Sequence, residues 1–392
     1  MRILHTVESY FPLTNGMQEM VKQISESLVQ RGHSVTIATS FHPDRKQHSI
    51  NGVTIEQFRI SGNTVRGIDG EEKQIRRYTN LLCSLQFDII TNFAAQQWAT
   101  DLALPILKQI HAKKVFVPTG FSGLYLPQYK EYFTKMKTWM KQYDMNVFLS
   151  NDYRDIDFAR KNGVKKRILI PNGASEEEFL STKYIDIRKK LGIPRNHFLI
   201  LHMGSHTGAK GHREAIEIFR KANICNATLL IVAQNSWSRC ARRCFLEKHI
   251  FNASFQRLKD KKQLIITSLS RRETVSAYKQ ADLFLFPSNI ECSPIVLFEA
   301  MASKTPFLTT DVGNAPEIIK WSKSGMLLPT SKDKYGYSLA EIDTSAVLLE
   351  TVYNDPKRRK TMADNGYRAW KKQFTWDKIA KQYEKVYQNI IA

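Results

Sequence analysis

The segment FPSNIECSPIVLFEAMASKTPFLTTDVGNAPE, residues Phe286–Glu317, shows most clearly how this chain folds. The apolar run Leu283–Phe286 predicts a buried strand, and the proline that follows cannot continue a hydrogen-bonded ladder. Ser293 is a favourable N-cap and proline is favoured at the first helical position, so we expect a helix over residues 294–302. The segment therefore predicts a strand, a turn and a helix, the repeating unit of an α/β domain.

Two carboxylates lie close to the start of this predicted helix. Glu291 precedes it, and Glu299 lies in its second turn, roughly 8 Å along the axis at about 1.5 Å per residue. Carboxylates accept hydrogen bonds from sugar hydroxyls, and the N–H groups and dipole of a helix N-terminus favour phosphate. From spacing alone, two solvated surface glutamates are an equally good interpretation.

Further residues follow this pair in a fixed order, as Ala300-Met301-Ala302, Thr305-Pro306, Asp311-Val312-Gly313 and Glu317-Ile318. The ordered set resembles the donor-sugar half of glycosyltransferase family 4, whose members are retaining, nucleotide-sugar-dependent enzymes of the GT-B fold. The resemblance implies an α/β fold of two Rossmann-like, doubly wound domains facing across a cleft. It also implies a catalytic Glu291 beside the transferred sugar and a Glu299 that holds the ribose hydroxyls.

Composition and cysteine usage restrict the class of protein. The 392 residues are 42% hydrophobic, enough to bury the cores of two domains. No apolar run is long enough to span a membrane and the N-terminus lacks a signal-peptide pattern, so we expect a cytoplasmic protein, with the cytoplasmic face of the membrane as an alternative location. The five cysteines have no histidine at zinc-ligand spacing, so we expect reduced structural thiols and no metal site.

The formal net charge of +21 favours a polyanionic partner, such as a phosphate-bearing substrate, an anionic membrane surface or nucleic acid. The sequence contains no recognised nucleic-acid-binding module and no basic low-complexity tail. We therefore expect no nucleic-acid partner.

A stripe of aromatic and apolar residues runs from Tyr129 to Tyr143 at helical spacing, with lysines beside it. The favoured interpretation is a core-packed helix with a solvated basic face. The alternative is an interfacial helix, whose lysines meet anionic lipid while its aromatic side chains enter the headgroups, as a lipid-linked acceptor would require. The triplet Asp155-Ile156-Asp157 falls in a predicted helix, and we interpret its acids as part of a solvated face.

The first domain begins with the strand, turn and helix typical of a parallel α/β sheet: Arg2–Val7, a turn with Asn15 and Gly16, and Met17–Gln30. Gly16 would let the backbone approach a phosphate closely. The resemblance identifies Asn15 and Gly16 with the glycine-rich loop near the donor diphosphate. A helix-capping turn with Asn15 as N-cap is the alternative.

Thr119 follows another predicted strand, Lys114–Pro118. Family members commonly have a histidine at this place under the donor sugar, so the resemblance implies a catalytic position for Thr119. A hydroxyl can donate a hydrogen bond there but cannot carry a proton's charge near neutral pH.

The second domain opens with the strand Phe198–Met203, the loop GSHTGAKG at 204–211 and a helix from His212. A glycine-rich loop between strand and helix is an anion cradle, to which a lysine adds a point charge. The resemblance assigns the donor diphosphate to Gly204, Ser205, Lys210 and Gly211, with Lys210 also catalytic. Ser205 stands where the family usually has arginine, and His206 is the candidate to replace that arginine.

Three further residues complete the expected donor site. Ser270 begins a capping-box sequence, and the resemblance places it near the nucleoside base. Cys292-Ser293-Pro294 replaces the Gly-Phe-Gly usual in the family. Because proline has no N–H, we expect Cys292 and Ser293 to donate to the sugar.

The predicted organisation is an acceptor-side domain over 1–175, a nucleotide-sugar domain over 176–375 and a C-terminal helix over 376–392 that crosses back to the first domain. The predicted function is retaining, metal-independent transfer of a hexosyl or N-acetylhexosaminyl group from a nucleoside diphosphate sugar, with UDP favoured. The acceptor is a glycan or lipid-linked hydroxyl in cell-surface polysaccharide or glycolipid synthesis, and the nucleotide sugar is a co-substrate without any cofactor. A GT-B epimerase or phosphorylase and a non-catalytic nucleotide-sugar-binding subunit are the alternatives, and a nucleic-acid-binding protein is the least favoured one.

Overall fold

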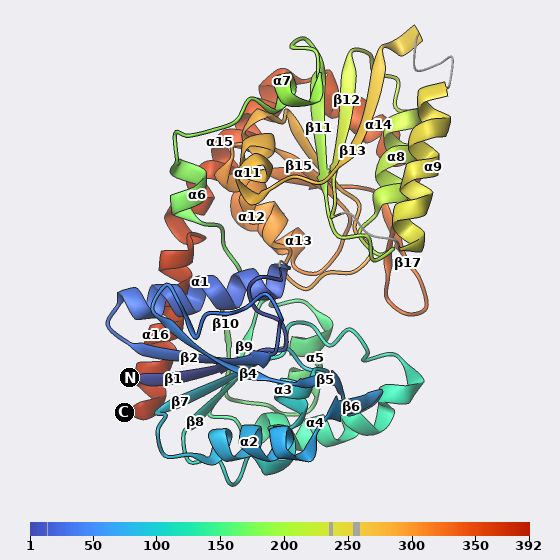
Figure 1. Cartoon of the computed structure of the whole chain (residues 1–392). Coiled ribbons are helices and arrows are strands. Elements are labelled where there is room, and N and C mark those ends of the chain that lie inside the picture. The colour runs from blue at the N-terminus through green and yellow to red at the C-terminus, as the bar shows by residue number, and fades with distance from the viewer. Residues whose placement is uncertain (14, 235–237, 254–258) are drawn as a thin grey trace. The chain divides into compact units, whose positions relative to one another are not determined.

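The computed structural model describes residues 1–13, 15–234, 238–253 and 259–392, which form two compact units (Figure 1). Unit 1 contains Met1–Gly173 and Trp376–Ala392, and unit 2 contains Ala174–Thr375. Each unit is built on its own parallel sheet with helices packed on it.

Unit 1 contains a large sheet, a small hairpin and helices between the strands. The strands of the sheet are β1 Arg2–Thr6, β2 Ser34–Ser40, β3 Ser49–Ile50, β4 Val53–Phe58, β7 Ile89–Phe93, β8 Lys113–Val117, β9 Met145–Phe148 and β10 Arg167–Leu169. The hairpin is β5 Ile60–Asn63 and β6 Gly67–Gly70. The helices are α1 Gly16–Gln30, α2 Glu72–Cys83, α3 Trp98–Asp101, η1 Leu104–Ile106, η2 Pro127–Tyr129, α4 Lys130–Gln142, α5 Arg154–Lys161 and α16 Trp376–Ile391.

The strand order in the described part of this sheet is β10-β9-β8-β7-β1-β2-β4-β3, and every pair is parallel except β3 with β4. With the short β3 set aside, the strands from β4 to β10 lie in the sheet as third, second, first, fourth, fifth, sixth and seventh in chain order. This is the doubly wound Rossmann order, in which the order reverses between β1 and β7. Ligands bind beyond the carboxyl ends of the strands at such a reversal.

The C-terminal helix α16 belongs to unit 1, where it packs on α1. The hydroxyl of Tyr387 lies 3.1 Å from Nε2 of His5 and 2.8 Å from Oγ1 of Thr91, so one buried group ties α16 to both β1 and β7. Burial lowers the pKa of His5 to about 3, and its ring is therefore neutral at neutral pH. The hydroxyl of Tyr383, also buried, has no hydrogen-bond partner in the described part of the chain.

The aromatic stripe of α4 faces the core of unit 1. Tyr129, Tyr132, Phe133, Met136 and Met140 are all buried. The prediction of a core-packed helix is confirmed. The alternative, in which these side chains enter lipid headgroups, is wrong because hydrophobic packing already covers them.

The prediction that the Asp155-Ile156-Asp157 triplet is solvated is wrong for its first acid. Asp155 is fully buried on α5, and its carboxylate accepts hydrogen bonds from the backbone N–H groups of Ile156, at 2.9 Å, and Gly120. Burial raises the pKa of Asp155 to about 7. Only Asp157 lies on the outer face, 3.2 Å from Arg160. A helix of eight residues is too short for its sequence pattern to show which acid faces inward.

Unit 2 has a second sheet, a short hairpin and its own set of helices. The strands of the sheet are β11 Phe198–Met203, β12 Ala227–Val232, β13 Lys262–Thr267, β14 Leu283–Phe286, β15 Phe307–Thr309 and β16 Gly325–Leu327. The hairpin is β17 Thr330–Lys332 and β18 Ser338–Ala340. The helices are α6 Glu176–Leu180, α7 Ile187–Leu191, α8 His212–Lys221, α9 Arg239–Ala253, α11 Arg271–Gln280, α12 Ile295–Ala302, α13 Ala315–Ser322, α14 Ile342–Tyr353 and α15 Pro356–Gln373.

The described strands of this sheet are all parallel and have the order β13-β12-β11-β14-β15-β16. In chain order this is third, second, first, fourth, fifth and sixth, again the Rossmann order. Two hydrophobic clusters cover the two faces, one with α11, α12 and α15 and the other with α8 and α14 (Figure 1). Two Rossmann-like doubly wound units confirm the predicted fold class.

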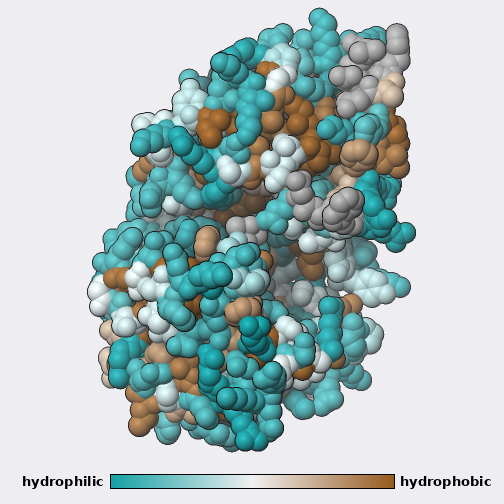
Figure 2. Space-filling model, in the orientation of Figure 1, coloured by the Kyte–Doolittle hydropathy of each residue, from teal (hydrophilic) through white to brown (hydrophobic). Residues whose placement is uncertain are grey.

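The face of the molecule in Figure 2 is mostly hydrophilic, with apolar residues showing where Figure 1 draws β12 and β13 and, at the edge, α9. The exposed apolar side chains of α9 are Phe245, Leu246 and Ile250. In the described part of the chain, no helix is both long enough and apolar enough to cross a membrane.

Candidate functional site

The loops that follow β11 and β14 carry the strongest candidate residues of unit 2. The two strands are neighbours in the sheet, and the strand order reverses between them. Both loops leave the carboxyl ends of their strands, which is where doubly wound sheets bind ligands. Lys210 lies in the first loop and Glu291 in the second, so the fold brings these two predicted residues to one edge.

Hydrogen bonds and a close backbone approach hold the two loops together. The N–H of Asn289 donates to the carbonyl oxygen of Ala209 at 2.9 Å, and Oγ of Ser288 lies 3.1 Å from the same oxygen. Gly211 has a φ of +73°, and a Cβ on it would lie 2.0 Å from the carbonyl oxygen of Pro287. Only glycine permits this approach, so the sequence places a glycine where the loops meet.

Lys210 and Glu291 form an ion pair at this junction. The distance from Nζ of Lys210 to Oε1 of Glu291 is 2.6 Å, and Ser288 donates to the same carboxylate oxygen at 2.9 Å. The two charged side chains are 28% and 13% exposed, so solvent screens them only in part. No side chain caps α8, whose N-cap is Gly211, the residue after Lys210. A fixed cation beside a helix N-terminus is suited to an anion such as phosphate.

The remaining residues of the first loop have different surroundings. A Cβ on Gly204 would lie 2.8 Å from Cβ of Lys210, so this glycine makes room for the lysine. Ser205 is exposed, and its carbonyl oxygen accepts from Thr207 at 2.8 Å. Burial lowers the pKa of His206, so a neutral ring does not supply the positive charge of the arginine it was expected to replace.

The second loop is held by the segment that follows β15. Asn314 donates through its backbone to the carbonyl oxygen of Cys292 at 2.8 Å and through Nδ2 to Oγ of Ser293 at 3.0 Å. Gly313 has a φ of +53°, and a Cβ on it would lie 2.4 Å from the carbonyl oxygen of Cys292. The prediction that Ser293 caps the helix is wrong, because α12 begins one residue later than expected, after Pro294, and the serine hydroxyl bonds to Asn314 instead.

Glu299 is buried, 3% exposed, and pairs with an arginine that sequence reasoning missed. Nη2 of Arg271 lies 2.6 Å from Oε1 of Glu299 and 2.6 Å from Oε2 of Glu178, and its Nε lies 2.9 Å from Oε1 of Glu178. The position of Arg271 in the sequence could have indicated this ion pair. A cation at the first residue of α11 is unfavourable beside the positive end of the helix dipole, so a carboxylate partner is expected there.

Ser270 is the N-cap of α11, and the predicted capping box is confirmed. Its N–H donates to Oε2 of Glu273 at 2.8 Å, and its carbonyl oxygen accepts from Thr274 at 2.8 Å. A hydrogen bond from Lys190 is the main cause that lowers the pKa of Glu273 to about 2. The turn is therefore held by several hydrogen bonds, and the role of Ser270 toward a base stays a prediction.

Asn15, Gly16 and Thr119 are the candidate residues of unit 1. Oδ1 of Asn15 accepts from the N–H of Gln18 at 2.8 Å, so Asn15 is the N-cap of α1, as the capping alternative predicted. Thr119 has a φ of +55° and is followed by Gly120 and Phe121, which also have positive φ. Backbone strain at a branched residue is costly and tends to be kept at functional sites.

Comparisons with known proteins cover nearly the whole chain. A family model described as Glycosyltransferase Family 4 matches residues 14–178, and one described as Glycosyl transferases group 1 matches residues 184–369. An uncharacterized glycosyltransferase of Methanocaldococcus jannaschii is 24% identical over 99% of this chain and 98% of its own length.

Two solved structures have the same architecture. The sucrose-phosphate synthase of Thermosynechococcus elongatus superposes with a TM-score of 0.79 at 16% identity, over 99% of this chain and 98% of that protein. The Anabaena protein HepE in complex with UDP-glucose has a TM-score of 0.72 at 14% identity, over 99% of this chain and 100% of that protein. At this identity, the likeness shows the fold.

Proposed function

Since the chain belongs to glycosyltransferase family 4 and has the GT-B fold, it is a glycosyltransferase, and we propose that it moves a hexosyl or N-acetylhexosaminyl group from a UDP-sugar with retention of configuration. We infer that the acceptor is a hydroxyl of a glycan or of a lipid-linked sugar, in cell-surface polysaccharide or glycolipid synthesis. The choice of UDP is supported by the complex of the Anabaena protein with UDP-glucose.

The observation that carries this proposal is the ion pair between Lys210 and Glu291 at the carboxyl edge of unit 2. A sugar that leaves a diphosphate passes through an oxocarbenium-like state while negative charge grows on the departing phosphate. Lys210 and the uncapped start of α8 would stabilise that charge. Because Glu291 already holds the ammonium group at 2.6 Å, the cation needs little reorganisation when the donor binds.

The two glutamates have separate roles in the proposed reaction. Glu291 orients hydroxyls of the transferred sugar, and the backbone N–H groups of Cys292 and Ser293 donate to that sugar. Glu299 accepts from the ribose hydroxyls, and Arg271 fixes its carboxylate. The restraint matters because a positioned acceptor loses less conformational entropy on binding than a mobile one.

The remaining parts of the proposal concern unit 1 and the conditions of the reaction. Thr119 would donate a hydrogen bond to the sugar from its strained turn, and Gly16 would let the backbone approach the diphosphate. The nucleotide sugar is a co-substrate, and the transfer uses neither a metal ion nor a cofactor. We propose a cytoplasmic enzyme that reaches lipid-linked acceptors at the anionic membrane face.

The test is to measure thermal unfolding of the full chain with a panel of nucleoside diphosphate sugars, and then transfer with the donor that stabilises it. Lys210→Ala is expected to lose this stabilisation and the transfer. Lys221, at the end of α8, forms an exposed ion pair with Asp343 of α14. Lys221→Ala removes the same charge and is expected to change neither the stabilisation nor the transfer. The anomeric configuration of the product, read by NMR, tests retention.

Other outcomes would contradict the proposal. Consumption of the donor without an acceptor would identify an epimerase. Tight binding without turnover would identify a nucleotide-sugar-binding subunit. An inverted anomeric centre would exclude the retaining mechanism, and equal losses in Lys210→Ala and Lys221→Ala would exclude a specific role for Lys210.

A further inference from the structure

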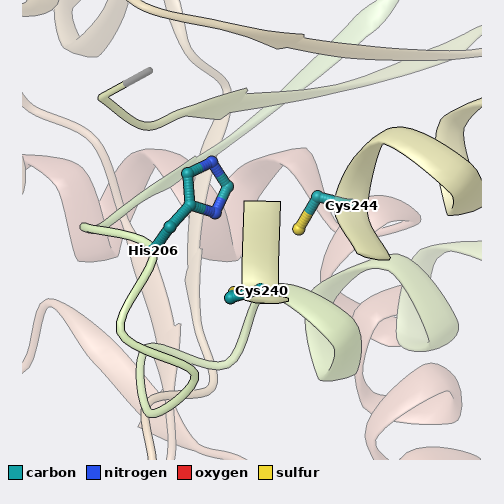
Figure 3. Close-up of side chains that lie close together, drawn as sticks. All are labelled: His206, Cys240 and Cys244. Carbon is teal, nitrogen blue, oxygen red and sulfur yellow. The ribbon is translucent and has the colours of Figure 1, made fainter. Parts of the chain in front are cut away.

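Three side chains that the proposed reaction does not use form a cluster in unit 2. His206, Cys240 and Cys244 each offer one potential ligand atom, and these atoms all lie within 4.8 Å of one another (Figure 3). His206 comes from the loop after β11, and both cysteines come from α9. Spacing along the chain did not predict this cluster, because the histidine lies far from the cysteines in the sequence.

Local geometry explains why the cysteines converge. Cys240 and Cys244 are four residues apart on α9, and residues at this spacing share one face of a helix. Cys244 is buried and Cys240 is partly buried. Figure 3 shows the sulfur of Cys244 turned toward the space beside the His206 ring.

An unsatisfied nitrogen marks the third member of the cluster. Nδ1 of His206 is buried and has no hydrogen-bond partner among the described residues. The ring of His206 stacks on that of His212, with centroids 4.8 Å apart and planes inclined by 24°, so its orientation is fixed. A buried polar atom without a partner requires an explanation, and a bound ion is one of the few available.

A purely structural role explains the cluster less well. Two neighbouring thiols can hydrogen-bond to each other, but that arrangement leaves the nitrogen of His206 without a partner. A cation bound between the three groups would satisfy the nitrogen and both sulfurs together.

We propose that His206, Cys240 and Cys244 bind one zinc ion. Thiolate and imidazole are the ligands that Zn²⁺ prefers, in tetrahedral sites with Zn–S of about 2.3 Å and Zn–N of about 2.0 Å. In tetrahedral geometry two sulfurs on one zinc lie about 3.8 Å apart. This spacing is within the 4.8 Å that bounds the cluster. Water fills the fourth position.

The ion would attach the loop at 204–211 to helix α9. That loop carries Lys210, and Gly211 joins it to the turn before Glu291. Zinc would therefore hold this loop at His206, four residues before Lys210, as a second attachment besides Gly211. This role adds to the proposed sugar transfer and does not depend on it.

The test uses the full chain, reduced, stripped of metal with a chelator and titrated with Zn²⁺ or Co²⁺. We expect one equivalent of zinc to bind and to raise the melting temperature. The Co²⁺ form is expected to show thiolate charge-transfer absorption and tetrahedral ligand-field bands. His206→Ala, Cys240→Ala and Cys244→Ala should each weaken zinc binding more than the 10- to 100-fold typical of a lost supporting group.

Cys225→Ser is the matched control, because it removes an exposed thiol of the same unit and should leave zinc binding unchanged. Should Cys244→Ala fail to fold, His206→Ala still tests the site, since this histidine lies in a partly exposed loop. Zinc binding that survives in His206→Ala, binding that falls equally in Cys225→Ser, or no stoichiometric binding at all would each overturn the proposal. A Cys240–Cys244 disulfide in the protein as isolated, with no metal bound after its reduction, would also overturn it.

Discussion

Replacing Glu299 with glutamine is expected to weaken binding of the nucleoside diphosphate while the fold persists. The substitution keeps the size of the side chain and one acceptor oxygen but removes the negative charge. Glu299 is 3% exposed as a residue, and its carboxylate lies 2.6 Å from Nη2 of Arg271. The change therefore affects both the stability of unit 2 and the proposed contact with ribose, and the two effects can be measured separately.

The expected loss of stability is moderate. Breaking a fully buried ion pair costs about 3–5 kcal/mol. Arg271, however, is 41% exposed and keeps two hydrogen bonds to Glu178, so it is not left unpaired. We therefore expect a loss of about 1–2 kcal/mol. For a domain of this size, each kcal/mol lowers the melting temperature by about 2–4 °C.

The loss of affinity for UDP is estimated from the hydrogen bonds that the carboxylate would make to the ribose. Hydrogen bonds to a charged group contribute about 1.5–3 kcal/mol, and about 1.4 kcal/mol corresponds to a tenfold change in affinity. The Kd for UDP should therefore rise about 10- to 100-fold in Glu299→Gln. UDP has no transferred sugar, so calorimetric titration with UDP isolates the ribose contact from the role of Glu291.

Glu178→Gln is the matched control, because it alters the other carboxylate that binds Arg271. That pair is more exposed, so we expect a change of about 1 kcal/mol or less in stability and an unchanged Kd for UDP. An unchanged Kd in Glu299→Gln would refute the ribose assignment. An equal rise in both variants would show that Arg271, and not Glu299, determines the affinity.

Three further predictions test particular contacts. Gly211→Ala should destabilise unit 2 and lower activity, because its Cβ would clash with a backbone oxygen. Gly208→Ala, at a φ of +85° in open space, should lower the free energy of unfolding by only about 1–2 kcal/mol. Equal losses for the two variants in denaturant unfolding would contradict the close approach at Gly211. The pKa of Asp155, about 7 in the fold against an ordinary 3.8, means that its contribution to stability is fully present below about pH 4 and is lost as the pH rises through 7. The advantage of Asp155→Asn in urea unfolding should therefore grow from pH 4 to pH 8, and a pH-independent difference would argue against burial as the cause. Tyr387→Phe removes two buried hydrogen bonds and should lower the free energy of unfolding by about 1–3 kcal/mol. Tyr383→Phe removes a hydroxyl without a partner in the described chain and should leave the stability unchanged or raise it. A larger loss of stability in Tyr383→Phe than in Tyr387→Phe would disprove the role of the Tyr387 hydroxyl.

Local patterns predicted many elements of this chain well. Leu283–Phe286 and Phe198–Met203 begin and end as expected, and Ser270 forms its capping box, because apolar runs, prolines and caps act over a few residues. The errors have a common cause. The cap assigned to Ser293 and the solvent exposure assigned to Asp155 both depended on partners distant in sequence, namely Asn314 and Gly120.

The candidate site shows the same difference between local patterns and contacts with residues distant in sequence. The sequence identified Lys210, Glu291 and Glu299 as charged residues beside helix starts, with the glycines that allow close approach. It did not show that Lys210 and Glu291 pair with each other, or that Arg271 holds Glu299.

By itself, then, the sequence predicted strand–turn–helix units from short-range patterns. Its ordered motifs identified the family, and that resemblance implied the two Rossmann-like halves. Tertiary structure alone decided which charges neutralise one another and that His206 meets Cys240 and Cys244. The physical reason is that parallel strands adjacent in a sheet are distant in the chain. Their loops meet only after the sheet has formed, and pairwise electrostatics and ligand geometry depend on distances of a few ångströms.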